Sequence, residues 1–146
     1  MKMQHLLKVV PIALVMNLFL IKASLAQTPA IEIKQTLPTD PLVLNGTSGG
    51  SVASNCGNIT KAPTQVIQVR ESLPYLRLTV ESEGQPTLLI EGPGGRFCIL
   101  GDNYSGGKPE ISGFWQAGNY LLFIGELSPA QHNYTLSISQ QPQPSN

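Results

Sequence analysis

The chain has 146 residues, and nine Lys and Arg stand against nine Asp and Glu, so its formal net charge is zero. The basic residues are scattered, which excludes the electrostatic footprint that binding to nucleic acid or an anionic membrane requires. The length fits one domain of ordinary size with its own core.

Residues 1–26 have the pattern of a signal peptide. Two lysines form a basic start, an apolar run follows that is short for a bilayer span, and Ser24-Leu25-Ala26 is a small-x-small cleavage site. The alternative is a retained membrane anchor, which a proline and an asparagine inside this segment disfavour because each interrupts an apolar helix. We expect cleavage, a secreted or periplasmic product, and no membrane association after it.

Both cysteines, Cys56 and Cys98, lie beyond this leader. An oxidising compartment favours pairing them, and closing such a loop is worth about 4 kcal/mol in the chain-entropy model. The alternatives are a free thiol or an intermolecular bridge. A catalytic thiol would need a nearby base, and nothing in the sequence ties His132 to either cysteine. We predict a structural disulfide.

Ahead of the main pattern, residues 27–40 form a polar, proline-punctuated lead-in with at most a short edge strand around Glu32. A strand is expected at 42–44, and the small, polar run 47–58 predicts a loop with one short strand at most. This loop contains Cys56, so pairing with Cys98 would attach it to the core.

From Gln65 onward, short runs with period-two alternation are bounded by Gly, Pro or Asn, and no apolar repeat has helical spacing. The two runs that flank Gly92-Pro93-Gly94-Gly95 should pair as a hairpin, because glycine accepts the positive φ of tight turns. Leu121 and Phe123 make one strand apolar on both faces, as in a central strand or one flanking an interface. The expected strands are 66–70, 76–80, 87–91, 96–100, 110–112, 120–124 and 134–139, and the tail 140–146 is expected to be disordered.

Seven or eight such strands predict an all-β, two-sheet antiparallel β-sandwich over residues 41–139. Trp115 is expected in the core or at a corner, and its alternative role is a platform that stacks sugars or apolar ligands. The expected core residues are Leu76, Leu78, Val80, Leu88, Ile90, Phe97, Ile99, Trp115, Tyr120, Leu122, Ile124, Leu136 and Ile138.

Four segments of the C-terminal half recur in a known family. They are 76–80, 86–95, the strand 117–125 with its Ala-Gly-Asn-Tyr turn, and the closing strand 134–138. Through them, residues 74–139 resemble the bacterial pre-peptidase C-terminal domain, a small jelly-roll-like sandwich of secreted proteins. The resemblance implies a module that usually accompanies a catalytic domain, often a protease, and that assists secretion or binds a substrate or surface. We expect the domain to stand alone here, as in similar short secreted bacterial proteins.

One motif suggests catalysis. Residues 46–50 match the G-x-S-x-G pattern, and Ser48, Asp102 and His132 follow in the order of a hydrolase triad. That pattern works where a strand feeds a helix in a large α/β sheet, and no helix is predicted here. We therefore expect a loop without catalytic function, and keep a small hydrolase using Ser48 and His132 as the alternative.

Asp102, Asn103 and Glu110 offer oxygen ligands of the kind calcium prefers. Calcium takes six or more such ligands, and few carboxylates stand together here, so turn capping by Asp and Asn is the expected role. We expect neither a metal nor another cofactor.

The leading hypothesis is an exported, non-enzymatic β-sandwich module that binds a polysaccharide, an envelope component or a partner protein. Tyr75, Tyr104 and Trp115 are the candidate ligand-binding residues, because exposed aromatic rings would form a flat patch. The alternative is a structural or secretion-assisting module without a ligand.

Overall fold

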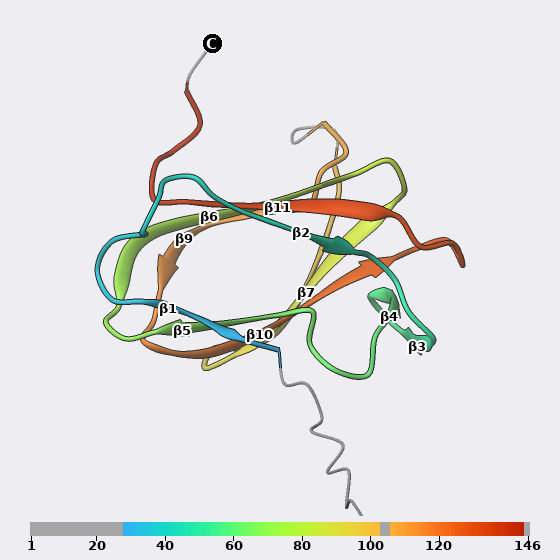
Figure 1. The fold of residues 1–146 in the computed structure, drawn as a ribbon, viewed down its shortest axis with the longest axis horizontal. Helices are drawn as coiled ribbons and strands as arrows, with labels where there is room; N and C mark the ends of the chain where they lie inside the picture. Colours follow the sequence, from blue (N-terminus) through green and yellow to red (C-terminus); the bar gives the residue numbers. More distant parts are fainter. Residues whose placement is uncertain (1–27, 103–105, 145–146) are drawn as a thin grey trace, which may run out of the picture.

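The computed structural model describes residues 28–102 and 106–144, which form eleven strands in two facing sheets (Figure 1). The predicted leader, 1–26, lies outside these residues. Within the described ranges, no helix has the length and apolar character needed to cross a membrane. The predicted all-β sandwich is confirmed, with more strands than the seven or eight expected.

The larger sheet is built around β10. Its path runs β1 (Ala30–Ile33), β5 (Gln65–Val69), β10 (Gly118–Glu126), β4 (Gly57–Ile59) and β3 (Val52–Ser54), while β7 (Pro86–Gly92) pairs with β10 and with β8 (Gly95–Leu100). β1 and β5 are parallel, and the other strand pairs of this sheet are antiparallel. Since β10 pairs with β5 and β7 at once, it is the central strand that its two apolar faces predicted.

The smaller sheet has four antiparallel strands in the order β2 (Leu42–Thr47), β11 (Asn133–Ser139), β6 (Leu73–Ser82) and β9 (Glu110–Trp115). β9 is longer than the strand expected at 110–112 and includes the Phe114-Trp115 pair. In this topology β1 and β2 are edge strands, and so are β8 and β9.

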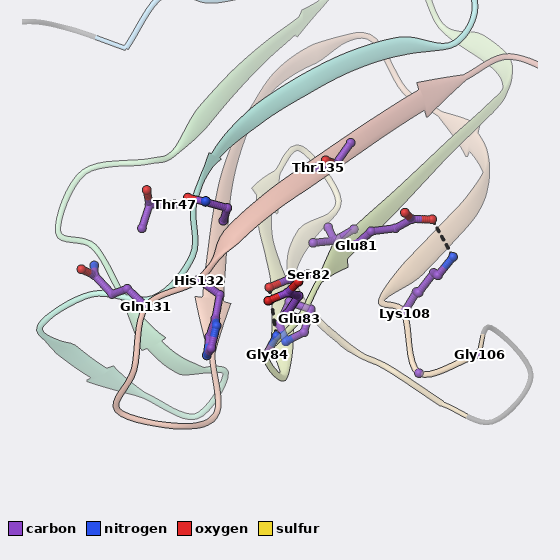
Figure 2. A pocket seen from close by; sticks show the side chains of 14 residues that line it. Thr47, Glu81, Ser82, Glu83, Gly84, Gly106, Lys108, Gln131, His132 and Thr135 are labelled. Carbon is purple, nitrogen blue, oxygen red and sulfur yellow. Dashed lines mark hydrogen bonds and ion pairs between the residues drawn. The ribbon is translucent and has the colours of Figure 1, made fainter.

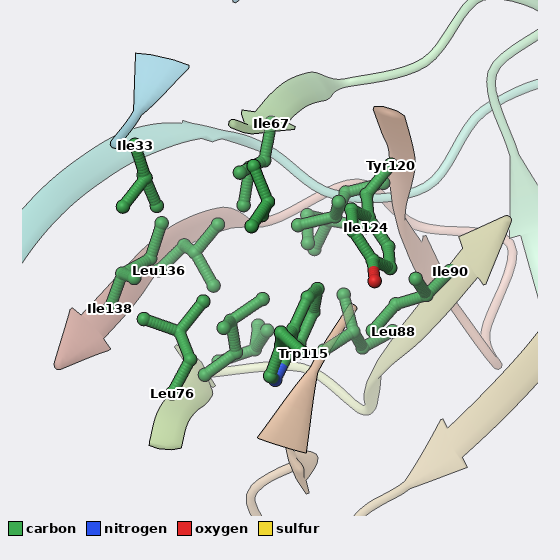
Figure 3. Packing of buried hydrophobic residues seen from close by; sticks show 14 of the residues in the cluster. Ile33, Ile67, Leu76, Leu88, Ile90, Trp115, Tyr120, Ile124, Leu136 and Ile138 are labelled. Atoms are coloured by element: carbon green, nitrogen blue, oxygen red, sulfur yellow. The ribbon is translucent and has the colours of Figure 1, made fainter. Parts of the chain in front are cut away.

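The core lies between the two sheets (Figure 3). Every predicted core residue is buried except Phe97 and Ile99, and Ile99 packs against the core from a half-buried position. The prediction for Phe97 is wrong. Its side chain is 49% exposed, because β8 pairs only with β7 among the described strands. The core also includes residues that were not predicted, namely Ile33, Leu37, Ile67, Val69, Leu73 and Tyr134.

The segment expected as a polar lead-in contributes to the sandwich. The expected edge strand is present as β1, and Ile33 and Leu37 are buried in the core. Gln140, the first residue of the expected tail, holds this segment in place. Its side-chain oxygen accepts a hydrogen bond from the Leu37 N–H at 2.9 Å, and its amide nitrogen donates to the Gln35 carbonyl at 2.8 Å.

A second apolar cluster covers the outer face of the larger sheet. The prediction of at most one short strand in 47–58 is wrong, because β3 and β4 pair with each other there and β4 also pairs with β10. Cys56 and Ile59 are buried in this cluster against Leu89 and Phe123. The predicted disulfide is confirmed: Cys56 bonds to Cys98 of β8, with 5.7 Å between the Cα atoms.

Candidate functional site

A groove lies between the two edge strands β8 and β9. Its volume is about 270 Å³, and we call it the open-edge groove. It forms where the two sheets end side by side without a strand joining them. The residues that line it include Ile90, Phe97, Gly113, Phe114, Trp115 and Tyr120.

Gly113 keeps the wall of the groove open. The pairing of β6 with β9 sets Ile111 and Gly113 opposite core residues, so both positions face the sandwich interior. A Cβ atom at Gly113 would meet no atom within 4 Å, so the space that a side chain would fill is empty. The φ angle of +138° also favours glycine at this position.

Trp115 and Tyr120 both line the groove. Figure 3 shows their rings next to each other among the core side chains. Their ring centroids are 4.6 Å apart and their planes are tilted by 54°. Trp115 is only 6% exposed, so it is a core residue and does not form the exposed, flat platform that was considered for it. Burial raises the pKa of Tyr120, so its hydroxyl stays protonated and donates to the Gln116 carbonyl at 2.7 Å.

The indole N–H of Trp115 has no acceptor among the described residues. No buried side-chain nitrogen or oxygen in that part of the chain lacks a partner, so this N–H must still reach solvent. Trp115 also lines the groove. The groove thus has mainly apolar lining residues next to an indole whose N–H donor is unused, a composition typical of ligand sites.

Two exposed apolar residues line the groove: Phe97 is 49% exposed and Phe114 68%. Sequence reasoning missed this rim, because it placed Phe97 in the core and did not single out Phe114. A usable signal was present: Phe114 and Trp115 are adjacent in one strand, so their side chains point to opposite faces and only one can face the core.

The other aromatic candidates do not join this site. Tyr75 is half-buried on β6 and does not line the groove, and Tyr104 lies outside the described residues. The structure therefore does not bring Tyr75 and Trp115 into one exposed patch.

A second concavity, the polar cleft, has a volume of about 900 Å³ (Figure 2). It is lined by Glu81, Glu83, Lys108 and His132 together with small polar residues. Lys108 Nζ lies 2.5 Å from Glu81 Oε1, so these two charges pair with each other. No sequence pattern indicated this cleft, because its residues come from distant segments.

A buried carboxylate lies next to the polar cleft. Glu126 is fully buried, and it accepts hydrogen bonds from the Gln85 N–H at 2.6 Å and from Ser128 Oγ at 3.2 Å. A Cβ at Gly84 would come within 2.4 Å of His132 Cδ2 and 2.7 Å of Glu126 Oε2. Gly84 is therefore required for this packing, and the carboxylate already has its donors.

The structure brings Ser48 and His132 together, but through the main chain. The His132 N–H donates to Ser48 Oγ at 3.3 Å, and Ser48 Oγ lies 3.3 Å from Glu126 Oε2. Ser48 is fully buried, and the chain after it continues to β3 instead of a helix. Asp102 follows β8, where its carbonyl accepts a hydrogen bond from Gly107. The hydrolase alternative thus has a nucleophile that no substrate reaches in this conformation.

Glu110, one of the three calcium candidates, already has hydrogen-bond partners. Glu110 Oε2 accepts hydrogen bonds from Thr79 Oγ1 at 3.0 Å and from Gln143 Nε2 at 3.1 Å. Asn103 lies outside the described residues. In the part of the chain that the structure describes, no group of three or more His, Cys, Asp or Glu side chains is placed to hold a metal ion.

Comparison with known proteins identifies a sequence relative and solved structures with a similar fold. No family model matches the chain. The fold is similar to the pre-peptidase C-terminal domain of collagenase from Bacillus anthracis, with a TM-score of 0.51 and 13% identity over 78% of this chain and 98% of that domain. It is also similar to PliG of Aeromonas hydrophila, a periplasmic inhibitor of g-type lysozyme, with a TM-score of 0.44 and 14% identity over 79% of this chain and 98% of that one.

The pre-peptidase C-terminal resemblance inferred from the sequence is therefore confirmed at the level of the fold. The relative is the uncharacterized protein Synpcc7942_2126 of Synechococcus elongatus, which is 39% identical over 120 residues that cover 80% of this chain and 86% of that protein. This chain belongs to the family of that Synechococcus protein, and its fold is that of a pre-peptidase C-terminal domain.

Proposed function

We propose that this chain is an exported, non-enzymatic binding module and that the open-edge groove is its ligand site. The observation that carries the proposal is an apolar groove lined by Trp115 and by the exposed residues Phe97 and Phe114. The ligand belongs to the class expected from the sequence, namely a polysaccharide, an envelope component or a partner protein. No metal or cofactor takes part.

The composition of the rim supports this proposal. Single exposed hydrophobic residues are normal on protein surfaces, but contiguous exposed patches mark interaction sites. Phe97 and Phe114 line one groove. The other exposed large hydrophobics among the described residues, Val43, Val52, Leu100 and Leu127, do not line this groove.

Export is supported by two independent features. The leader has the order of regions typical of a signal peptide. The bond between Cys56 and Cys98 fits an oxidising compartment, where such bonds persist. The ligand is therefore sought among molecules outside the cytoplasm.

Trp115 provides the test, because it is the only tryptophan of the chain. The purified protein is screened on a glycan array and against fractionated envelope material, and every hit is titrated while the tryptophan emission is recorded. We expect at least one hit that shifts the emission and that fails to bind a Phe97→Ser/Phe114→Ser variant.

The control is Val43→Ser, because Val43 is 48% exposed but lies on β2. This variant should bind as the wild type does. Uniform failure to bind, or binding that the groove variant retains without an emission shift, would favour the alternative of a module without a ligand at this site.

A further inference from the structure

We propose that the open-edge groove receives an extended peptide segment of a partner protein, which adds to the free edge of β8 as a new strand. This inference rests on the proposed function, because it names the ligand class of the same site. It is carried by the backbone of β8, by the size of the groove and by the lack of charged residues and proline at 97–100.

The hairpin register shows which backbone groups of β8 are free. Gly92 and Gly95 are partners in the hairpin and are separated by a two-residue turn. In such a turn the two flanking residues form a hydrogen-bonded pair, in which each N–H donates to the other residue's carbonyl. Along an antiparallel ladder, hydrogen-bonded and non-hydrogen-bonded pairs alternate, so the backbone groups of Phe97 and Ile99 also form hydrogen bonds with β7. The N–H and C=O groups of the residues between them point away from β7.

Those residues are Arg96, Cys98 and Leu100. β8 has no strand partner other than β7 among the described residues. The free edge therefore offers three donors and three acceptors, with successive residues of the set about 7 Å apart. This spacing is complementary to an extended peptide and has no counterpart in a sugar chain.

Edge strands are usually protected by charges, prolines or bulges. β1 follows this rule, because Glu32 forms ion pairs with Arg70 at 3.3 Å and with Lys34 at 3.9 Å. On β8 the only charged residue is Arg96, which is next to the turn and lies 3.6 Å from Glu91. Residues 97–100 have no charge and no proline, so this part of the edge is an exposed template for pairing.

The disulfide strengthens this template. Cys98 is in the middle of β8, and its partner Cys56 is fully buried under the outer face of the sheet. This link fixes β8 to the cluster formed with Leu89 and Phe123, so the edge is held in an extended conformation before a ligand arrives. A preformed edge lowers the entropic cost of binding.

The groove then selects the peptide's side chains. Side chains of an added strand alternate between the two faces of the sheet, so every second one enters the groove beside Phe97 and above Trp115. A volume of about 270 Å³ is below the roughly 300–1,000 Å³ of pockets that hold drug-sized ligands. It suits one or two apolar side chains.

The experiment begins with a library of random peptides displayed on phage and selected on the purified protein. An enriched peptide is synthesised and titrated against Trp115 emission, and amide hydrogen exchange is measured with and without it. We expect enriched sequences with alternating apolar residues. Exchange at Arg96, Cys98 and Leu100 should slow by about 100-fold when the free peptide is at about 100 times its Kd.

The matched comparison lies within the same strand. Exchange at Phe97 and Ile99 should change less, because their amides already bond to β7. A peptide N-methylated at alternate residues, on the side that faces β8, should lose binding. Leu100→Pro removes one outward N–H from an edge position where proline is tolerated, and should weaken the peptide by about tenfold or more.

Three other outcomes would overturn the proposed strand addition. A peptide that shifts Trp115 emission without protecting these three amides, or saccharides alone shifting it, would leave the groove as a ligand site but refute strand addition. Protection of the same amides without peptide, together with a dimer in sedimentation, would assign the edge to a second copy of the chain. If no peptide, saccharide or envelope fraction shifts the emission, the proposed function fails as well.

Discussion

The sheet edges on the two sides of the sandwich differ: one pair of edge strands is covered, and the other pair is not. On the side of β1 and β2, which we call the closed side, residues 34–41 pass from one sheet to the other and Leu37 fills the gap beside Ile33. On the side of β8 and β9, no described segment covers the groove, and Phe97 remains half exposed. The comparison assigns a stabilising role to the closed side, and the open side is where we propose the ligand site.

The largest expected effect comes from the disulfide, because it alone anchors the open side covalently. The variant Cys56→Ser/Cys98→Ser should lose about 4 kcal/mol of unfolding free energy, since the bond closes a 42-residue separation. Urea denaturation measures the loss. The wild type in reductant should fall to the same stability, and reductant should leave the variant unchanged. Equal stability of the two proteins under oxidising conditions would show that β8 needs no anchor.

The next effect tests the closed side. Ile33→Ala should cost about 3 kcal/mol, because it removes a fully buried side chain from the core. Ile31→Ala is the matched control, since Ile31 is on the same strand but only partly buried. Its loss, measured in the same denaturation experiment, should be clearly smaller. Similar losses at both positions would contradict the burial difference on which the closed side depends.

The closed side was the harder one to predict from the sequence. Ile33 and Leu37 are isolated apolar residues among prolines and polar residues, so no local alternation marks them as core. Ile33 is held by the pairing of β1 with β5, and Leu37 by a hydrogen bond to Gln140, so both depend on segments distant in the sequence. By contrast, β6 and β11 show clear alternation and β10 is a continuous apolar run, and the places of all three in the core were predicted.

The open side was predicted in its strands but not in its site. Alternation correctly puts Phe97 on the inner face of β8, opposite Ile90. Whether another strand covers that face depends on the topology of the sheet, which no local pattern contains. The pairing of β3 with β4 was missed for a related reason: these three-residue strands form because they pair with each other and because β4 pairs with the end of β10.

A smaller loss is expected at the contact that fixes the closed side. Gln140→Ala removes the acceptor of the Leu37 N–H and the donor to the Gln35 carbonyl. Each such hydrogen bond is worth about 1 kcal/mol net, so the expected cost is about 1–2 kcal/mol. Gln143→Ala is the control, because Gln143 makes one exposed bond to Glu110 and should change stability little. A neutral Gln140→Ala would mean that the crossing segment holds itself in place.

The smallest effect on stability is expected at the rim of the groove. Phe97→Ser should change the unfolding free energy by about 1 kcal/mol or less, because half of the side chain is already exposed. Val43→Ser gives the reference value for an equally exposed residue on the closed side. A loss as large as that of Ile33→Ala would assign Phe97 to the core and weaken the contrast between the two sides.

The most direct test of this contrast is a titration of Trp115 emission with the selected peptide in four proteins: wild type, Val43→Ser, Phe97→Ser and Leu100→Pro. The groove and edge assignment predicts the same emission shift and affinity in wild type and Val43→Ser, and affinities weaker by about tenfold or more in the two open-side variants. Equal affinities in all four proteins would show that binding does not use the open side.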